Sequence, residues 1–178
     1  MLSFWPVDGS LHGLSVTSSL NLLAAFSNPS VLQEYSTGGR LLRKINLKRA
    51  GITVPLHSVQ LTKDQFAVIH RVQRGQSCKR HQFSTVRADG QLVKSYRGEQ
   101  MDMNTPQGIA VDQRGKIFVA DQNNNRILVI DSKTLSAFPL PLSADCKLDG
   151  PYSIHFDPAS SRLYIGEWNA GRIICCKL

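Results

Sequence analysis

Histidine is the side chain in this sequence best suited to acid–base or metal chemistry, and its copies are widely separated. The five copies are His12, His57, His70, His81 and His155. None has the short spacing of a metal-binding motif, and none accompanies a nucleophile with a further group to orient it. No G-x-S-x-G, P-loop or Rossmann pattern occurs. The sequence therefore predicts no catalytic residue, no metal and no cofactor, in a protein that is not an enzyme.

A second pattern brings a carboxylate, an amide and a guanidinium close together. It consists of Asp121, Asn124 and Arg126, with a looser echo at Glu167, Asn169 and Arg172. Such groups can hold a ligand. A carboxylate at the end of one strand and an arginine at the start of the next also pair across a tight turn, while the amide bonds to the backbone. We predict this structural role, within or between repeats.

Positive charge is concentrated in the middle of the chain. The formal net charge is +8, and residues 40–100 contain 13 Lys+Arg and three Asp+Glu. This segment therefore carries +10 and the rest −2. A surface of one sign favours a polyanion, of which nucleic-acid phosphate is the commonest. A solvated loop that binds no partner would explain the same run of basic residues, and this alternative remains.

Cysteine usage and apolar runs indicate the compartment. The four cysteines form no C-x-x-C pair, and Cys175 and Cys176 are adjacent, which favours reduced thiols. The longest apolar stretch, residues 20–26, is far shorter than the roughly 20 residues that cross a bilayer. The first ten residues lack the basic and continuous apolar regions of a secretory signal. We therefore expect a cytoplasmic protein without a membrane partner.

A repeat of about 45 residues must position these groups. The segment PQGIAVDQRGKIFVADQNNNRILVID alternates apolar and polar residues in three stretches, at 109–111, 116–120 and 126–130. A copy begins near Ser153, and weaker copies begin near Gly13 and Ser58. In the first three units a turn follows the third strand and leads to a fourth, and glycine supplies the positive φ that such turns require. Repeated antiparallel strands without helical periodicity predict an all-β propeller. The residues expected in the core between repeats are Ile109, Val111, Ile117, Val119, Ile127, Val129, Ile154, Phe156, Leu163, Ile165 and Ile173.

The same segment resembles an NHL repeat, the propeller blade at the carboxyl end of tripartite-motif (TRIM-NHL) proteins. The resemblance implies a single partial propeller over residues 1–178, with blades near 10–50, 55–100, 105–145 and 150–178. Each blade would have four antiparallel strands, except the last with three. In the family an amino-terminal strand completes the last blade. Four blades of a larger ring leave open edges, so self-association is expected.

The resemblance also implies where the basic residues lie. Loops between the second and third strands, and loops between blades, emerge on one face of a propeller. Seven cations are expected there: Lys48, Arg49, Arg71, Arg74, Lys79, Arg80 and Arg97. Trp168 lies in the corresponding loop of the last unit and, with Tyr152, offers stacking for bases. The loop HRVQRGQSCKRH, residues 70–81, adds His70, Gln76 and His81 as base contacts.

These observations predict a non-enzymatic binding module. Because several TRIM-NHL propellers bind RNA, single-stranded or structured RNA is the first expected partner, and the module would be the substrate-recognition end of a TRIM-type ubiquitin ligase. A protein-interaction scaffold with protein substrates or adaptors is the alternative. A third is a metal-dependent propeller lyase or hydrolase, because His12 and His57 recur at nearly equivalent positions. The later units have Gln107 and Tyr152 there.

Overall fold

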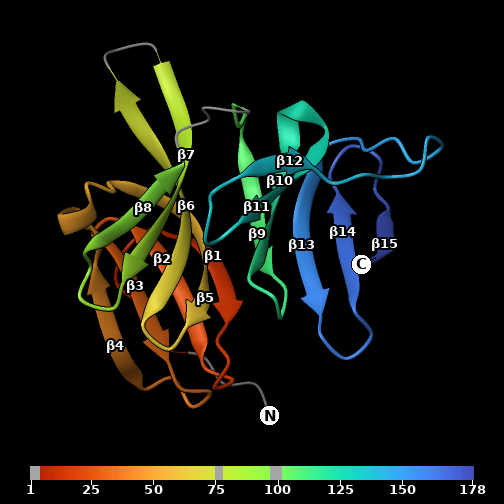
Figure 1. Cartoon of the computed structure of the whole chain (residues 1–178). Coiled ribbons are helices and arrows are strands. Elements are labelled where there is room, and N and C mark those ends of the chain that lie inside the picture. The colour runs from red at the N-terminus through yellow and green to blue at the C-terminus, as the bar shows by residue number, and fades with distance from the viewer. Residues whose placement is uncertain (1–4, 75–77, 97–101) are drawn as a thin grey trace. The chain divides into compact units, whose positions relative to one another are not determined.

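The computed structural model describes residues 5–74, 78–96 and 102–178, and their side chains except at 73, 74, 78 and 79 (Figure 1). The regular elements in this part of the chain are strands, apart from two short 3-10 helices, η1 (Leu47–Ala50) and η2 (Gln122–Asn124). None of its helices is long and apolar enough to cross a membrane. The strands form four antiparallel sheets, the last with three strands, which confirms the predicted all-β fold and its blade topology.

The chain divides into two compact units. Unit 1 contains Met1–Lys79 and Phe83–Ser95, and unit 2 contains Arg80–Gln82 and Tyr96–Leu178. In unit 1 the sheets are β1-β2-β3-β4 and β5-β6-β7-β8, each with its strands in chain order. The strands are β1 (Leu11–Val16), β2 (Leu22–Ser27), β3 (Ser30–Tyr35), β4 (Leu41–Asn46), β5 (Val54–Thr62), β6 (Gln65–Arg74), β7 (Cys78–Arg87) and β8 (Leu92–Tyr96).

The two sheets of unit 1 pack against each other through apolar side chains that recur every second residue. Leu23 and Ala25 of β2 point into this cluster and meet Phe66 and Val68 of the second sheet. The intervening Ala24 belongs to a cluster on the other face of the first sheet. Full burial of a large apolar side chain stabilises the fold by about 1.5–3 kcal/mol. Period-two alternation therefore selects both the strand and the face that it buries.

Unit 2 holds the remaining two sheets. Their orders are β12-β11-β10-β9 and β13-β14-β15. The strands are β9 (Pro106–Val111), β10 (Lys116–Asp121), β11 (Arg126–Asp131), β12 (Ala137–Pro139), β13 (Pro151–Asp157), β14 (Arg162–Glu167) and β15 (Ile173–Lys177). Phe118, Ile127 and Val129 of the four-stranded sheet pack against Leu163 and Ile165 of β14. The three predicted stretches of the clearest repeat are thus β9, β10 and β11, with bounds differing by up to three residues.

Two glycines let the first strands of neighbouring sheets approach closely. A Cβ on Gly13 of β1 would lie 2.6 Å from the Leu56 carbonyl oxygen, and a Cβ on Gly108 of β9 would lie 2.8 Å from that of Tyr152. Contacts this short exclude any side chain unless the backbone moves. Gly13 and Gly108 occupy equivalent positions of the repeat. In each unit a glycine therefore allows the first strands of the two sheets to come close together.

One expected core residue is exposed. Ile173 is 76% exposed, whereas Ile127, its counterpart in the preceding repeat, is 1% exposed. Ile127 lies on the face of its sheet that packs against β13–β15. Ile173 lies on the corresponding face of the last sheet, which no further sheet of unit 2 covers. The repeat alignment was correct, and the prediction failed because burial needs a following sheet.

The loop expected at residues 70–81 is instead mostly strand. β6 continues to Arg74 and β7 begins at Cys78. Val54, the first residue of β5, pairs with Arg71, so the hairpin extends beyond the strand next to it. Strand residues that extend past the sheet need no apolar face. The charged segment therefore lacks the alternation of apolar and polar residues that would have predicted these strands. His70 is 3% exposed, and its Nε2 lies 2.9 Å from Ser84 Oγ, so it is buried rather than offered to a base.

Candidate functional site

Each unit has an end at which the connector between its sheets and the turns between second and third strands emerge together. We call it the connector end, and the opposite one the hairpin end. In unit 1 the Ser30 hydroxyl donates to the Ile52 carbonyl oxygen at 2.7 Å, which ties the connector to the β2–β3 turn, and Val54 pairs with Arg71 of β6. In unit 2 the Gly150 amide donates to Asn125 Oδ1 at 2.8 Å, and the Trp168 amide donates to the Gly150 carbonyl at 2.8 Å. The connector is thereby tied to both turns.

Asp121 at the end of β10 is fully buried and binds the segment that precedes its own sheet. Its Oδ1 accepts the Asn104 backbone N–H at 2.7 Å. Its Oδ2 accepts Asn124 Nδ2 and Arg126 Nε, both at 2.8 Å. Arg126 Nη2 then donates to the Asp102 carbonyl oxygen at 2.6 Å. We call this group the Asp121 clasp, because it joins the β10–β11 turn to residues 102–104.

The looser copy of the motif makes the same kind of clasp. Glu167 Oε1 accepts the Asp149 backbone N–H at 2.6 Å, and its Oε2 pairs with Arg172 Nε. Arg172 Nη2 donates to the Lys147 carbonyl oxygen. Hydrogen bonds to Glu167 raise the pKa of the Arg172 guanidinium above its ordinary value. Asn169 departs from the pattern, because its Nδ2 donates to Asp149 Oδ1 at 2.8 Å rather than to the carboxylate of the motif.

The connector end of unit 2 also presents aromatic rings and amides. Tyr152 and Trp168 are 41% and 69% exposed, and their ring centroids lie 5.3 Å apart at an interplanar angle of 35°. Gln107 Nε2 donates to Gln122 Oε1 at 3.0 Å, and Asn123 Nδ2 donates to Thr105 Oγ1 at 3.0 Å. The sequence pointed to Trp168 and Tyr152 as stacking groups but not to these amides as a site, because single amides carry no motif. We call Tyr152, Trp168, Gln107, Gln122 and Asn123 the aromatic–amide surface.

Three of the predicted cations gather at the connector end of unit 1. Lys48 and Arg49 are exposed on η1, where the Lys48 backbone N–H bonds to Asn46 Oδ1 at 3.0 Å. Arg71 is half-buried at the position that pairs with Val54. The connector, residues 47–53, contains no acidic residue. We call Lys48, Arg49 and Arg71 the basic surface.

Of the other exposed cations of unit 1, Lys44 lies on β4 and Lys94 on β8, and three more lie at the opposite end. Arg40, Lys63 and Arg87 lie at or beside turns of the hairpin end, and Asp64 and Asp89 lie in the same turns as two of them. Arg43, counted in the basic segment, is held by an ion pair with Glu34 and lies 4.9 Å from the centroid of the Phe66 ring. The excess charge of unit 1 is therefore distributed over both ends and over β4 and β8, and the connector beside the basic surface contains no acidic residue.

Of the remaining residues predicted to bind a partner, the structure describes only some. Arg80 is exposed and belongs to unit 2, where the neighbouring His81 accepts the Thr105 backbone N–H on Nδ1 at 3.4 Å. Arg97, and the side chains of Arg74 and Lys79, lie outside the described residues. The base contact expected from Gln76 also lies outside them.

The two histidines of the metal hypothesis are engaged with neighbouring groups. His12 Nε2 lies 2.8 Å from Ser27 Oγ. His57 Nε2 lies 2.9 Å from the Leu14 carbonyl oxygen, which can only accept, so this nitrogen carries a proton. Burial lowers the pKa of His57, although the bond to Leu14 opposes this. Among the residues that the structure describes, no three His, Cys, Asp or Glu side chains group as metal ligands.

Comparison with known families supports the repeat. The NHL repeat family model matches residues 103–130, which contain β9, β10 and, apart from Asp102, the Asp121 clasp. Comparison with curated protein sequences yields no significant match. The match thus supports an NHL-type propeller repeat and leaves the resemblance to TRIM-NHL proteins unconfirmed.

Solved structures show the same fold at low identity. A protein of unknown function from Bacteroides caccae is 16% identical with a TM-score of 0.72, over 94% of this chain and 63% of its own. The catalytically inactive H270A virginiamycin B lyase from Staphylococcus aureus with quinupristin is 16% identical with a TM-score of 0.58, over 99% and 58%. XC5397 of Xanthomonas campestris, a gluconolactonase, is 12% identical with a TM-score of 0.58, over 93% and 61%. The chain spans 58–63% of the length of these three.

Proposed function

We propose that this chain is a non-enzymatic binding module whose basic surface binds the phosphates of single-stranded RNA. The observation that carries the proposal is the position of Lys48, Arg49 and Arg71 at one end of unit 1, where the connector contains no acidic residue. Lysine and arginine supply phosphate affinity without regard to sequence. The cations at the hairpin end lie close to acids in the chain and contribute less to such a field.

Base recognition is assigned to the aromatic–amide surface of unit 2. Exposed rings such as Trp168 stack on unpaired bases, and amide side chains bond to base edges. The exposed Arg80, next to His81 and the Thr105 backbone, adds a cation to this end of unit 2. In this proposal the basic surface of unit 1 supplies phosphate contacts, and the aromatic–amide surface of unit 2 supplies base stacking.

Fluorescence anisotropy with labelled single-stranded RNA of mixed sequence tests the proposal between about 50 and 200 mM salt. The variant Lys48→Glu/Arg49→Glu/Arg71→Glu should bind weakly. Its slope of log K against log salt should be shallower by about 2, since each lost phosphate contact removes about 0.7.

The control variant is Arg40→Glu/Lys63→Glu/Arg87→Glu, which makes the same change in net charge at the hairpin end. It should keep most of the affinity and slope of the wild type. Equal losses in both variants would show that net charge alone attracts the RNA. Unchanged binding in the first variant would remove the basic surface from the function.

A protein partner is the second candidate, and the charge of unit 2 favours it. Asp102, Asp145 and Asp149 are exposed on its connector segments, where they would repel phosphate and attract a basic peptide. This function would be supported over RNA binding if a protein partner bound the chain, lost that binding on Trp168→Ala, and kept it when Lys48 and Arg49 were changed.

The wider setting of the proposal is the recognition end of a TRIM-type ubiquitin ligase in the cytoplasm. The NHL repeat match supports a recognition role, and the thiols of Cys146, Cys175 and Cys176 are free, as a reducing compartment requires. Affinity purification of the full-length protein, followed by immunoblotting for ubiquitin conjugates, tests this setting. Recovery without conjugates would leave a binding module unconnected to ubiquitin.

A further inference from the structure

Two pairs of side chains occupy equivalent positions in the two repeats of unit 2. Each pair joins the second residue of a first strand to the residue that follows the second strand. In one repeat Gln107 of β9 contacts Gln122, and in the next Tyr152 of β13 contacts Trp168. The equivalence is exact, because Gln122 and Trp168 each come directly after the carboxylate of a clasp. The connector end of unit 2 therefore presents an amide pair and an aromatic pair at successive positions of the repeat.

The two pairs lie side by side. The backbones of β9 and β13 touch next to them, since a Cβ on Gly108 would lie 2.8 Å from the Tyr152 carbonyl oxygen. The turns are tied together as well. Asn125 Oδ1 accepts the Gly150 N–H, and the Gly150 carbonyl oxygen accepts the Trp168 N–H, both at 2.8 Å. A polymer with repeating units can therefore contact one pair with each of two successive units.

The amide pair offers a base one acceptor and one donor. Gln107 Nε2 donates to Gln122 Oε1 at 3.0 Å, which leaves Gln107 Oε1 as an acceptor and Gln122 Nε2 as a donor for a ligand. The Watson–Crick edge of an unpaired base carries a donor beside an acceptor and can bond to both atoms. A base within a duplex has no such edge to offer. The amide pair thus favours a single strand.

The aromatic pair offers one stacking face. The Tyr152 and Trp168 rings are already in contact, with centroids 5.3 Å apart, so no base fits between them. Trp168 is 69% exposed, and its ring face away from Tyr152 can take a base. Turn residues at this end stay exposed where a further sheet follows, as Asn123 and Asn124 do beside the sheet β13–β15. Exposure at the Trp168 turn is therefore a property of the connector end itself.

Charge at this end of unit 2 is nearly balanced. Among the described residues of its connector segments and turns, the exposed charged side chains outside the clasps are Asp102, Asp145, Asp149, Arg80 and Lys147. Acids in this number repel phosphate and hold the sugar–phosphate backbone away from the surface. Bases then face the protein, and their contacts should depend little on salt.

We infer that the two pairs bind two successive unpaired nucleotides of one RNA strand. One base stacks on Trp168, and the neighbouring base bonds through its Watson–Crick edge to Gln107 and Gln122. The inference rests on the proposed function and adds the unit that is recognised, a single-stranded dinucleotide step. Stacking accepts every base, so the site selects unpaired strands over duplexes rather than one sequence.

Fluorescence anisotropy of the whole chain with abasic RNA tests the inference. The labelled oligomers have equal length and charge, and they carry no base, two adjacent adenines, or two adenines separated by several abasic positions. Adjacent adenines should bind about 5- to 150-fold more tightly than the abasic oligomer, the range for stacking of one base. Separated adenines should bind about 2- to 10-fold more weakly than adjacent ones, because the second base cannot reach the amide pair.

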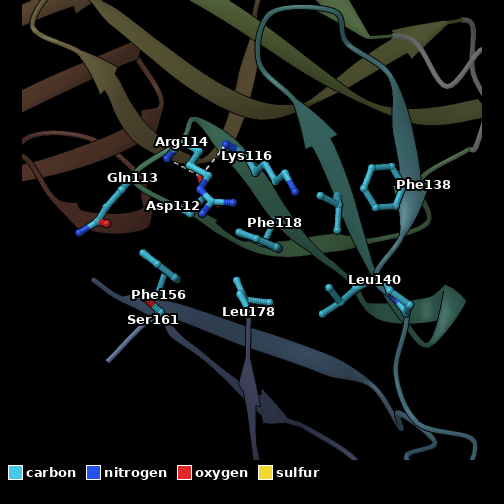
Figure 2. Close-up of a pocket in the computed structure, with 12 residues that line it drawn as sticks. Asp112, Gln113, Arg114, Lys116, Phe118, Phe138, Leu140, Phe156, Ser161 and Leu178 are labelled. Atoms are coloured by element: carbon cyan, nitrogen blue, oxygen red, sulfur yellow. Dashed lines mark hydrogen bonds between the residues drawn. The ribbon is translucent and has the colours of Figure 1, made fainter. Parts of the chain in front are cut away.

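Two variants assign these differences to the two pairs. Trp168→Ala should remove most of the preference for adenine over the abasic oligomer, and Gln107→Ala/Gln122→Ala should remove the advantage of adjacent adenines. Both should keep the affinity for the abasic oligomer and its salt dependence, which a misfolded chain would lose. The control Gln91→Ala/Gln113→Ala makes the same change at the hairpin ends and should alter nothing. Gln113 lies there beside the pocket between the two sheets that Figure 2 shows.

Tryptophan fluorescence gives an independent readout of stacking. The tryptophans of the chain are Trp5 and Trp168, so Trp5→Phe leaves Trp168 as the single emitter. The oligomer with adjacent adenines should quench this emission and saturate at the concentration found by anisotropy. The abasic oligomer should bind without quenching.

The possible failures separate the inference from the proposed function. Equal affinity for adenine and abasic oligomers, with binding still lost in Lys48→Glu/Arg49→Glu/Arg71→Glu, would overturn the inference and leave the basic surface as the RNA site. Equal affinity for adjacent and separated adenines would show that the pairs do not bind neighbouring bases. A preference for adenine that survives Trp168→Ala would place stacking elsewhere. Absence of binding to any oligomer would overturn the proposed function and the inference together.

Discussion

Replacing Asp121 with asparagine should destabilise unit 2 by breaking the Asp121 clasp. The carboxylate is fully buried and receives three hydrogen bonds on its two oxygens, from Asn104, Asn124 and Arg126. Asparagine has nearly the same shape but one oxygen and no charge. Whichever way its amide is turned, an NH₂ group faces donors, and the Arg126 guanidinium loses its counter-ion.

The expected cost follows from what remains unpaired. Removing one partner of a buried ion pair costs about 3–5 kcal/mol, and the 24% exposure of Arg126 favours the lower value, because water can reach the guanidinium. For a chain of 150–250 residues, each 1 kcal/mol shifts Tm by about 2–4 °C. A loss of about 3 kcal/mol therefore lowers Tm by about 6–12 °C.

Thermal and urea unfolding followed by circular dichroism measure this loss. Asp112→Asn is the matched control in the same sheet, because Asp112 Oδ1 accepts turn N–H groups that the asparagine oxygen also accepts. Its effect should stay within about 0.5 kcal/mol. The double mutant with Arg126→Gln should show a coupling energy of at least about 1 kcal/mol. Equal stability of the two asparagine variants, or zero coupling, would refute the clasp.

Three further changes test the close approach of strands, the pH dependence of a turn and the stacking surface. Gly108→Ala should cost about 1–3 kcal/mol in urea unfolding, because its Cβ would meet the Tyr152 carbonyl oxygen at 2.8 Å, whereas Gly38→Ala, with no atom closer than 3.9 Å, should be neutral. Hydrogen bonds from the Thr134 and Lys133 backbone lower the pKa of Asp131, so the part of its stabilisation that depends on the carboxylate charge is present at neutral pH and lost as pH falls below about 4. The amide oxygen of Asp131→Asn still accepts these N–H groups, so this variant should show only a small Tm deficit at neutral pH that vanishes below about pH 4, and a deficit independent of pH would contradict the reasoning. Trp168→Ala should leave Tm unchanged and weaken RNA binding by about 1–3 kcal/mol in the anisotropy assay, and full retention of affinity would exclude stacking on this ring.

The sequence predicted the strands well, because the burial of one face at a time imposes period two. Phe118 and Val129, which are paired across β10 and β11, show that register is set by the same alternation. Where the prediction of burial or of a loop was wrong, the reason lies in what surrounds the residue in the fold. Ile173 has the residue type of a core position but no sheet beside it, and His70 lies in a buried strand that its charged surroundings disguised.

The candidate site was less predictable because it depends on ends of sheets rather than on single motifs. Charge counts located the basic segment but did not divide it between the two ends. The expected propeller topology did so, because it says which turns emerge together, and it placed Lys48 and Arg49 on one face.

The faces that end the two units differ in chemistry, and this difference bears on self-association. Leu14 and Val16 of β1 are 54% and 59% exposed on the face of the first sheet away from the second. On the outward face of the last sheet, the row His155, Tyr164 and Cys175 replaces the apolar row Ala110, Phe118 and Val129 of the preceding repeat. An exposed apolar face gains from contact with another chain, whereas a polar one is already satisfied by water. Association between copies is therefore expected through the first sheet more than through the last, where Ile173, 76% exposed, is the apolar exception.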